Sequence, residues 1–379
     1  MTIDRAPRPA PVEAEGIVAA LQPLPRSRML PAVAYTGPEV LAWELEHFFA
    51  RSWTCVGRVE DLPIGGQRAV SAGSVAALLT RDTDGRLRAF ANLCRHRAHE
   101  LLPAGGSTAG RAVTCPYHAW SYRLEGSLMA APGFADLPAD SGLVSLPVEV
   151  WHGWVFVSGY AGAPPFADHV GALDRLVAPY AAERLVRRAR TEYVVDANWK
   201  VLSENYHECY HCPLIHPELC RVSPPDSGVN FDLPGTWVGG VMELADGAAT
   251  MSLDGGGGEP IPGLTERQRR TVAYLGLFPN LLLSLHPDYV LTHRLQPLEP
   301  GLTRVSCEWL FPPEAVGGDG FDPAYAVDFW DRTNRQDWAA CESVQRGIAS
   351  PHFRPGPLAS KEDAVHRFVA MVARGYQGR

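Results

Sequence analysis

Hydrophobic and polar positions alternate in short runs between residues 53 and 157, and this pattern predicts β-strands. Runs such as LRAFANL, AVTCPY and WVFVSG contain many β-branched and aromatic residues, and turn pairs such as Asp84-Gly85 separate them. Closely spaced strands of this kind predict a small antiparallel β domain, which we place at residues 51–160. The Gly-, Ala- and Pro-containing stretch at 159–168 predicts the linker that leaves this domain.

The rest of the chain mixes helical and strand-like patterns. Apolar residues recur at three- and four-residue spacing in segments that we predict to be helices, at 38–51, 168–189, 322–348 and 360–374. Apolar runs predict strands at 191–199 and across 236–310, with an irregular Gly-rich loop at 251–263. The pattern predicts an α+β fold, in which residues 1–50 form an N-terminal segment and residues 161–379 form a second domain with an antiparallel sheet and packed helices.

The densest group of chemically active residues lies in this second domain, at NWKVLSENYHECYHCPLIHP (198–217). Three histidines, two carboxylates and two cysteines stand close together there: His207, His211, His216, Glu204, Glu208, Cys209 and Cys212. The pattern predicts a short helix from about Ser203 to Cys212, ended by Pro213, with Glu204, Glu208 and His211 near one face. His216 then falls on a turn beyond the helix.

Composition narrows the function classes. The 34 basic and 42 acidic residues give a net charge of −8, which argues against a nucleic-acid-binding surface. No apolar run reaches the length of a membrane span, and the first residues lack the apolar core of a secretory signal. We therefore expect a cytoplasmic protein with no membrane partner, in which the eight cysteines are thiols or metal ligands rather than disulfides.

A second group of ligands lies in the β domain, where Cys94-Arg-His96 is followed after eighteen residues by Cys115-Pro-Tyr-His118. Each loop offers one cysteine and one histidine, whereas the common zinc finger pairs cysteine with cysteine and histidine with histidine. This order suits a [2Fe–2S] cluster in which the two cysteines hold one iron and the two histidines hold the other. A structural zinc site of unusual order is the alternative.

Together the two groups resemble the signatures of the Rieske-type non-haem iron oxygenases, large (alpha) subunit. NLCRHRA and CPYHAWSYRLEG are similar to the cluster-binding motif of that family, and NWK, EN and the His-x4-His pair are similar to its iron-binding motif. The two motifs lie about ninety residues apart in the family's order, and the resemblance covers most of the chain. It implies a Rieske domain followed by a mononuclear-iron catalytic domain of helix-grip type, with the N-terminal helix packed on the latter.

The resemblance also implies the ligands of two iron cofactors. The [2Fe–2S] cluster would be held by Cys94, His96, Cys115 and His118. A mononuclear Fe(II) would be held by His211, His216 and one carboxylate from a C-terminal helix. Asp337 falls at the matching position of that helix, with Asp331 and Glu342 as local rivals.

Glu208 stands where the family has an acid that links an iron-ligating histidine to a cluster histidine of the neighbouring subunit, for which His118 is the candidate. Glu208 lies within about one turn of His211, so its side chain can accept the outer N–H of that imidazole. Such a bridge implies head-to-tail subunits that close into a ring, and we expect a homotrimer. Most of the family carry Asp here, and Glu is typical of branches that oxidise quaternary amines.

A competing motif overlaps the same stretch, because His207-Glu208-Cys-Tyr-His211 satisfies the zinc-metalloprotease pattern H-E-x-x-H. In that interpretation His207 and His211 bind zinc and Glu208 is the general base. Pro213 would shorten the helix that the motif needs, and the upstream cluster motif would have no purpose. Cys209-x2-Cys212 could likewise be a zinc knuckle, although buried structural thiols are commoner.

As an oxygenase, the chain would use O2 and electrons that come from NAD(P)H through a separate flavin/iron–sulfur reductase, because it has no dinucleotide-binding fingerprint of its own. Segments 198–219, 289–297 and 329–347 are similar to the branch that demethylates glycine betaine, proline betaine and related quaternary amines. This similarity implies hydroxylation of an N-methyl carbon and release of formaldehyde. Hydroxylation of an aromatic or alicyclic small molecule by the same centre is the alternative.

The sequence does not place the substrate-binding residues. A quaternary ammonium is stabilised over aromatic ring faces by roughly 2 kcal/mol when it is desolvated. Rings for such a cage could come from Tyr206, Tyr210, Trp237, Phe278 and Trp309. Residues that could support the iron site or face the pocket are Glu204, Asn205, His286, His293 and Arg294.

Overall fold

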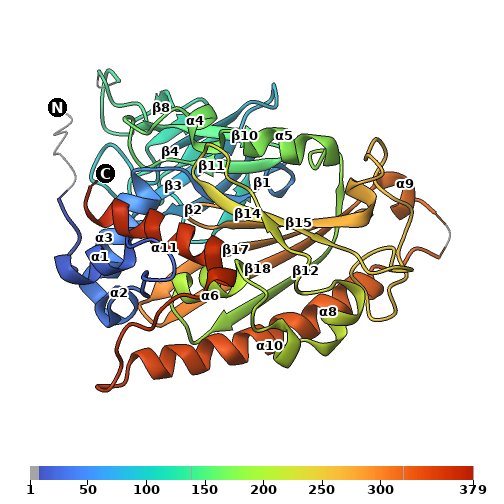
Figure 1. Ribbon diagram of the computed structural model, residues 1–379. Coiled ribbons are helices and arrows are strands. Elements are labelled where there is room, and N and C mark those ends of the chain that lie inside the picture. Colours follow the sequence, from blue (N-terminus) through green and yellow to red (C-terminus); the bar gives the residue numbers. More distant parts are fainter. Residues whose placement is uncertain (1–7, 138, 319, 379) are drawn as a thin grey trace. The chain divides into compact units, whose positions relative to one another are not determined.

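The computed structural model describes residues 8–137, 139–318 and 320–378, and these residues form two compact units. One unit spans Glu44–Phe166, and the other combines the described residues up to Trp43 with those from Ala167 onward. Antiparallel sheets form both units, and most helices belong to the second (Figure 1). This arrangement confirms the predicted α+β fold class.

The unit Glu44–Phe166 contains three antiparallel sheets. One sheet has the order β1 (Thr54–Arg58), β11 (Trp154–Val157), β10 (Val148–Trp151). A second has the order β5 (Ser107–Ala109), β2 (Gly66–Ala72), β3 (Val75–Arg81), β4 (Leu87–Ala91), β9 (Ser145–Leu146). The third has the order β6 (Ala112–Thr114), β7 (Ser121–Arg123), β8 (Leu128–Ala130). A 3-10 turn, η2 (Val59–Asp61), follows β1.

Two hydrophobic clusters form the core of this unit. One gathers buried aliphatic residues such as Val56, Leu79 and Val157 from the first two sheets. The other contains Cys94 and Cys115 among residues such as Phe90, Trp120 and Tyr122. Both predicted cysteine ligands are therefore anchored in a packed core, which fixes the positions from which their loops project.

The other unit is built on one seven-stranded antiparallel sheet. Its strands, in spatial order, are β12 (Val186–Val195), β18 (Leu302–Phe311), β17 (Val290–Glu299), β16 (Leu281–Leu285), β15 (Thr271–Leu277), β14 (Trp237–Glu243) and β13 (Val229–Asn230). The central strand β16, LLLSL, is buried along its whole length, as a strand covered on both faces should be. The loop at 251–263 has no regular structure, as predicted.

Two long helices pack in this unit. α10 (Ala324–Ile348) packs on α6 (Trp199–Tyr206) and β12, and α11 (Asp363–Tyr376) packs on α6 and β14 (Figure 1). The buried residues of α10 recur at three- or four-residue steps, which gives the helix one face toward the core. Shorter helical segments are α1 (Ala14–Ala20), α2 (Ala32–Thr36), α4 (Phe166–Val170), α5 (Leu173–Val177), η3 (Ala178–Tyr180), α7 (Cys212–Ile215), α8 (Pro217–Val222), η4 (Gln268–Arg270), α9 (Pro313–Val316) and η5 (Ser360–Glu362).

Several predicted boundaries are wrong. The helix predicted at 38–51 forms as α3 (Pro38–Glu44) and a π-helical stretch, η1 (Leu45–Ala50). The helix predicted at 168–189 breaks into α4, α5 and η3, and β12 then begins at Val186 rather than at 191. Asn198 caps α6, because its side chain accepts a hydrogen bond from Lys200 N, so the predicted strand ends before it.

The helix predicted from about Ser203 to Cys212 is also wrong, because α6 already ends at Tyr206. Pro213 does not end a helix but lies in the first turn of α7, where a missing N–H costs no helical hydrogen bond. Residues 207–211 therefore form a turn between two short helices. This turn, rather than a helix face, carries Glu208 and His211.

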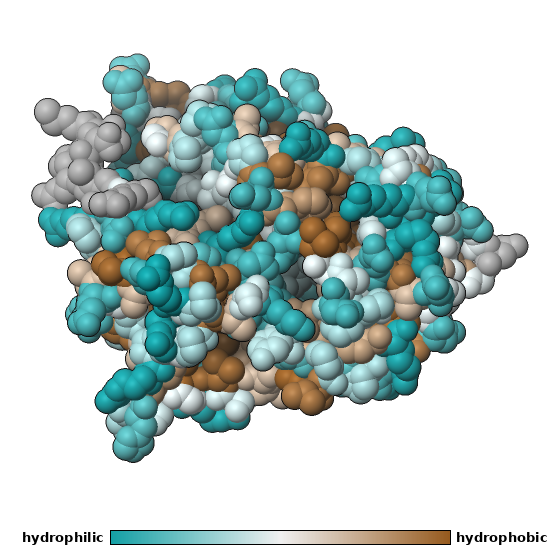
Figure 2. Space-filling model, viewed as in Figure 1, coloured by the Kyte–Doolittle hydropathy of each residue, from teal (hydrophilic) through white to brown (hydrophobic). Residues whose placement is uncertain are grey.

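No helix in the described ranges is both long and apolar enough to cross a bilayer. On the face shown in Figure 2, hydrophobic residues form separate patches among hydrophilic ones.

Candidate metal centres

The two loops that carry the predicted cluster ligands have the same backbone construction. Each cysteine N–H donates to the carbonyl five residues later, at 2.8 Å in both loops, and each cysteine carbonyl accepts from the N–H four residues later, at 2.9 Å and 3.1 Å. The residues at those fourth positions, Ala98 and Ala119, have φ of 59° and 57°. A left-handed alanine costs roughly 1 kcal/mol or more, so both loops adopt a shape that local preference alone does not favour.

The four predicted cluster ligands differ in exposure. Cys94 and Cys115 are buried, whereas the rings of His96 and His118 are partly exposed, with centroids 4.8 Å apart. In the described part of the chain, Nδ1 of His96 is buried and has no hydrogen-bond partner. A buried imidazole nitrogen without a partner, on a loop with a buried thiol, suits a metal ligand. The residues present therefore fit a Cys2His2 [2Fe–2S] cluster.

Tyr122, on β7, is a residue of this centre that the sequence did not reveal. Its hydroxyl lies 3.2 Å from Cys94 Sγ and accepts a hydrogen bond from Arg95 N at 3.0 Å. Burial raises the pKa of Tyr122, so the phenol keeps its proton. When Cys94 is a thiolate ligand, only Tyr122 can donate in this pair, and such a hydrogen bond stabilises the reduced form of a cluster.

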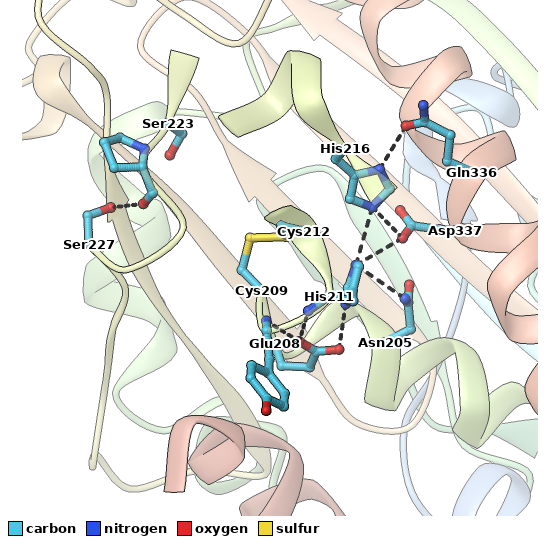
Figure 3. The surroundings of a disulfide bond; sticks show 12 residues. Asn205, Glu208, Cys209, His211, Cys212, His216, Ser223, Ser227, Gln336 and Asp337 are labelled. Carbon is cyan, nitrogen blue, oxygen red and sulfur yellow. Dashed lines mark hydrogen bonds and ion pairs between the residues drawn. A yellow bond between two sulfur atoms is a disulfide. The ribbon is translucent and has the colours of Figure 1, made fainter. Parts of the chain in front are cut away.

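In the other unit, the three predicted iron ligands meet at one point. Nε2 of His211 and Nε2 of His216 lie 3.2 Å apart, and Asp337 Oδ1 lies 3.2 Å from the first and 2.8 Å from the second (Figure 3). Donors that bind one metal at about 2.1 Å on one face of an octahedron lie about 3 Å apart. Within the described ranges, these three side chains form a group of possible metal ligands whose ligand atoms all lie within 4.8 Å of one another. The donor set fits a mononuclear iron.

Each of these histidines is oriented through its other ring nitrogen. Nδ1 of His211 lies 2.5 Å from Glu208 Oε1, and Nδ1 of His216 lies 2.8 Å from Gln336 Oε1. Both partners are acceptors, so both Nδ1 atoms carry a ring proton, and in the neutral imidazoles both Nε2 lone pairs face Asp337. Two lone pairs and a carboxylate oxygen at this separation attract a cation.

The pKa values of His211, His216 and Asp337 also indicate that the site attracts a cation. Burial lowers the pKa of His211, but its contacts with Asp337 and Glu208 outweigh burial and raise the pKa to about 9. For His216, burial is likewise outweighed by the contact with Asp337, so its pKa is raised. Burial raises the pKa of Asp337, but the two imidazoles outweigh it and lower the pKa. The site therefore favours positive charge at its centre.

The periodicity of α10 explains why Asp337 and not its rivals reaches this point. Asp337 follows the buried Thr333 and Asn334 by one helical turn and precedes the buried Cys341 by another, so it belongs to the core-facing stripe. Asp331 lies off this stripe, where it accepts hydrogen bonds from Tyr193 (2.5 Å) and Arg335 (2.8 Å). Glu342 also lies off the stripe, and its Oε1 accepts from Asp196 N at 3.4 Å.

The turn beside the site contains a disulfide, which corrects the expectation that all eight cysteines are thiols or metal ligands. Cys209 and Cys212 are bonded to each other (Figure 3), so they are not a zinc knuckle either. Their Cα atoms lie 4.9 Å apart, within the ordinary range for a disulfide, because the turn folds back between α6 and α7. The six other cysteines form no disulfide.

The metalloprotease hypothesis fails on the same geometry. His207 lies at the end of α6 and is buried, with ring contacts to Tyr206 and Phe368. Burial lowers its pKa to about 3. It does not join the set formed by His211, and the H-E-x-x-H residues lie on a turn instead of a helix. The acid and the second histidine of the motif instead pair directly with each other.

A cavity of about 690 Å³ lies beside the three converging ligands, all of which contribute to its wall. Of the five predicted cage aromatics, Tyr206 and Tyr210 line it. Trp237, Phe278 and Trp309 are buried and do not contribute to its lining. The sequence missed the other aromatic side chains of the wall, which are Tyr274, Trp330 and Trp338. Strand alternation and the α10 stripe were the available signals for them.

The remaining predicted site residues divide into two groups. Asn205 and His293 line the cavity, with Asn205 Nδ2 3.5 Å from His211 Nε2 and His293 Nε2 3.0 Å from Asn334 Oδ1. Glu204 does not line the cavity: it accepts a hydrogen bond from Tyr35 OH at 2.7 Å, and burial raises its pKa to about 7. His286 instead stacks on Tyr289 in the core, and Arg294 donates to Ser306 Oγ on the sheet.

Comparison with known protein families identifies the family to which a chain with these two centres belongs. Residues 182–378 match the family of the ring-hydroxylating alpha subunit, catalytic domain, and residues 52–141 match the Rieske [2Fe–2S] domain. The chain belongs to the Rieske-type ring-hydroxylating oxygenases, as an alpha subunit. The oxygenase therefore uses a Rieske [2Fe–2S] cluster and a mononuclear iron, acts on a small molecule with O2, and depends on a separate reductase.

Named relatives of the oxygenase are similar over most of their length. The glycine betaine monooxygenase oxygenase subunit of Chromohalobacter salexigens is 31% identical over 87% of this chain and 81% of its own. The chloroplastic choline monooxygenase of Spinacia oleracea is 28% identical over 89% of this chain and 76% of its own. Neither the metalloprotease nor the aromatic or alicyclic alternative is favoured by these relatives.

Solved structures support the fold of the oxygenase. The quaternary ammonium Rieske monooxygenase CntA in complex with gamma-butyrobetaine superposes with a TM-score of 0.77, at 25% identity, over 97% of this chain and 99% of its own. Naphthalene 1,2-dioxygenase from Rhodococcus superposes with a TM-score of 0.74 at 18% identity, over 96% of each chain, which shows the fold alone.

Proposed function

We propose that the oxygenase N-demethylates a quaternary amine of the betaine class, with release of formaldehyde. The observation that carries the proposal is the aromatic wall of the cavity beside His211, His216 and Asp337. Tyr206 and Tyr274 lie with ring centroids 6.1 Å apart, and Tyr274 and Trp330 lie 6.3 Å apart. Ring faces stabilise a desolvated quaternary ammonium by roughly 2 kcal/mol. The names of the relatives, which act on glycine betaine and choline, support the same class.

The charge of the cavity lining also supports a cationic substrate. Apart from Asp337, which is an iron ligand, and Glu208, which pairs with His211, the described lining has two carboxylates, Asp226 and Asp363, and Lys361. Opposite charges within a cleft raise the local concentration of a ligand, and this electrostatic term works together with the ring faces. A neutral hydrocarbon of the same shape would gain neither.

In this proposal, Cys94, His96, Cys115 and His118 hold the cluster, and His211, His216 and Asp337 hold the iron. When bound, the iron supplies the activation of O2 for insertion into a substrate C–H bond. The chain's own residues prepare the site: Glu208 and Gln336 hold the Nδ1 protons of the two histidines, which leaves both Nε2 atoms free for the metal. The aromatic wall orients the trimethylammonium group so that a methyl carbon faces these ligands.

We also propose that Glu208 links His211 to a cluster histidine of a neighbouring subunit, within a homotrimer. Its side chain is 14% exposed, so the carboxylate is within reach of the surface. Tyr210 and Leu214, two and six residues further along the chain, are 59% and 92% exposed, which suits a surface that another subunit covers. Glutamate reaches one methylene further than the aspartate found in most of the family. The cytoplasm is the compartment that we expect for this assembly.

The test is turnover by the full chain with a Rieske-type reductase, NADH and O2, on a panel of paired substrates. Each quaternary amine is paired with a neutral isostere in which carbon replaces nitrogen, and formaldehyde is measured against NADH consumed. We expect about one formaldehyde per NADH for at least one quaternary amine and none for its isostere. Trp330→Leu should weaken binding of the amine by about 30-fold, from the roughly 2 kcal/mol of one cation–π contact, and leave the isostere unaffected. Oxidation of neutral aromatics without formaldehyde would contradict the proposal.

A further inference from the structure

The turn between α6 and α7 contains a disulfide that the proposed function does not use. Cys209 and Cys212 both line the cavity, next to the converging ligands (Figure 3). Cys212 is 3% exposed and Cys209 is partly exposed. The bond is therefore reachable by a small oxidant or reductant that enters the cavity.

The ring that this bond closes contains His211 and lies directly after Glu208. Oε2 of Glu208 accepts hydrogen bonds from the backbone N–H groups of Tyr210 and His211, and Oε1 lies 2.5 Å from His211 Nδ1. A carboxylate has about two acceptor positions on each oxygen. In the bonded turn, both positions of Oε2 are therefore taken by amides of the chain itself.

We propose that Cys209 and Cys212 are a reversible thiol-oxidation site that controls whether Glu208 is free to contact a neighbouring subunit. This inference rests on the bridging role proposed for Glu208 above. In the disulfide form the turn holds Oε2 inward. In the dithiol form the turn is free to open, the two amide donors withdraw, and Oε2 is available to an imidazole N–H of the neighbouring subunit.

Oxidation of the pair needs only hydrogen peroxide, and its reduction needs only a dithiol. Oxidation joins the two sulfur atoms and removes two electrons and two protons, so that two thiols and one hydrogen peroxide give the disulfide and two waters. A dithiol reverses it by exchange through a mixed disulfide, and is itself oxidised to a disulfide. In reducing compartments, the disulfides that do occur are usually catalytic or redox-sensing, and Cys-x-x-Cys is a common arrangement for them.

The test begins with the state of the pair, independently of activity. The full chain is treated with hydrogen peroxide or with a dithiol and is then alkylated and digested. The mass of the peptide that contains residues 209–212 is measured by mass spectrometry. Both treated forms are then reduced at the cluster by dithionite, freed of excess reductant, and mixed with substrate and O2, while the cluster absorbance is followed without reductase. We expect cluster reoxidation to be about 10-fold slower in the disulfide form and to recover after treatment with a dithiol. Loss of a hydrogen-bond partner of a metal-ligating histidine typically lowers metal affinity or activity by at least this factor.

Matched variants distinguish oxidation of this cysteine pair from other effects of peroxide on cluster reoxidation. Cys212→Ser should make reoxidation insensitive to peroxide, whereas Cys220→Ser, a free and partly exposed thiol on α8, should leave the sensitivity unchanged. A pair that stays reduced under peroxide, equal rates in both forms, or peroxide sensitivity that survives in Cys212→Ser would overturn the inference. If Glu208→Gln in the dithiol form reoxidises as fast as the unaltered chain, the bridging role itself fails; if Glu208→Gln is slow while the pair has no effect, only the switch fails.

Discussion

The two metal centres of the oxygenase are held in place by different parts of the chain. The cluster ligands lie within residues 94–118, on two loops with matching backbone hydrogen bonds and matching left-handed alanines. The iron ligands combine His211 and His216 with Asp337, which follows more than a hundred residues later, and they are oriented by the side chains of Glu208 and Gln336.

This difference shows how each centre can be altered. A centre shaped by the backbone loses its cofactor when a ligand is removed, but its geometry does not depend on one outer side chain. A centre oriented by side-chain hydrogen bonds can lose function while its ligands remain, because each imidazole depends on a single acceptor.

The largest effect is expected at the backbone-held centre. Cys94→Ser should abolish the brown colour and the [2Fe–2S] absorbance, since a hydroxyl does not replace the thiolate. Cys55→Ser, at another buried cysteine of the same unit, should keep both. Visible and electron paramagnetic resonance spectra provide the measurement. A Cys94→Ser protein that retains the spectrum would mean that the cluster ligands are assigned wrongly.

At the centre oriented by side chains, Glu208→Gln should keep both metals and lose activity by about 100-fold, because the amide oxygen can still accept from His211 Nδ1 but no second carboxylate oxygen remains to accept from an imidazole of the neighbouring subunit. Glu342→Gln, off the core-facing stripe of α10, is the matched control, and its turnover and iron content should be close to those of the unaltered chain. Turnover and iron content are measured together on both variants. Loss of iron in Glu208→Gln would show that the acid holds the site together rather than linking it to a neighbour.

A smaller effect is expected at Gln336, which orients the other imidazole. Gln336→Leu removes the acceptor of His216 Nδ1, so the ring is free to rotate and the mononuclear iron should bind about 10-fold more weakly. Titration of the iron-depleted protein with Fe(II) measures this affinity, with the cluster absorbance as an internal standard. An unchanged affinity would indicate that packing alone orients His216.

The smallest effect returns to the cluster. Tyr122→Phe removes the hydrogen bond to Cys94 Sγ and should lower the reduction potential of the cluster by about 40 mV, which corresponds to roughly 1 kcal/mol for one electron. Tyr180→Phe, a buried tyrosine of the other unit, should not change the potential. A potential that stays the same in Tyr122→Phe would mean that the hydroxyl contributes nothing to the cluster.

The difference between the two metal centres also determines how much of each centre could be predicted from the sequence. Local spacing indicated the cluster ligands, and the helical period of α10 could select Asp337 over Asp331, because both signals are contained within one segment. The partners Tyr122 and Gln336 could not be predicted, because they come from a strand and a helix whose packing against the ligands the sequence does not state.

The turn at 207–211 was predicted wrongly for a physical reason. Glu204, Glu208 and His211 fit the helical period, and a proline at 213 commonly ends a helix. In the structure Glu208 accepts the N–H groups of Tyr210 and His211, which replaces helical hydrogen bonds with side-chain ones. The disulfide between Cys209 and Cys212 holds the same turn.

We propose that His211, His216 and Asp337 hold a mononuclear iron separate from the cluster. The number of irons per chain, measured by elemental analysis of purified protein, tests this assignment. We predict about three irons in the unaltered chain and about two in Asp337→Ala, with the cluster spectrum unchanged, and about three in the matched control Asp331→Ala. About three irons in Asp337→Ala, or a loss of iron in Asp331→Ala instead, would show that Asp337 is not an iron ligand.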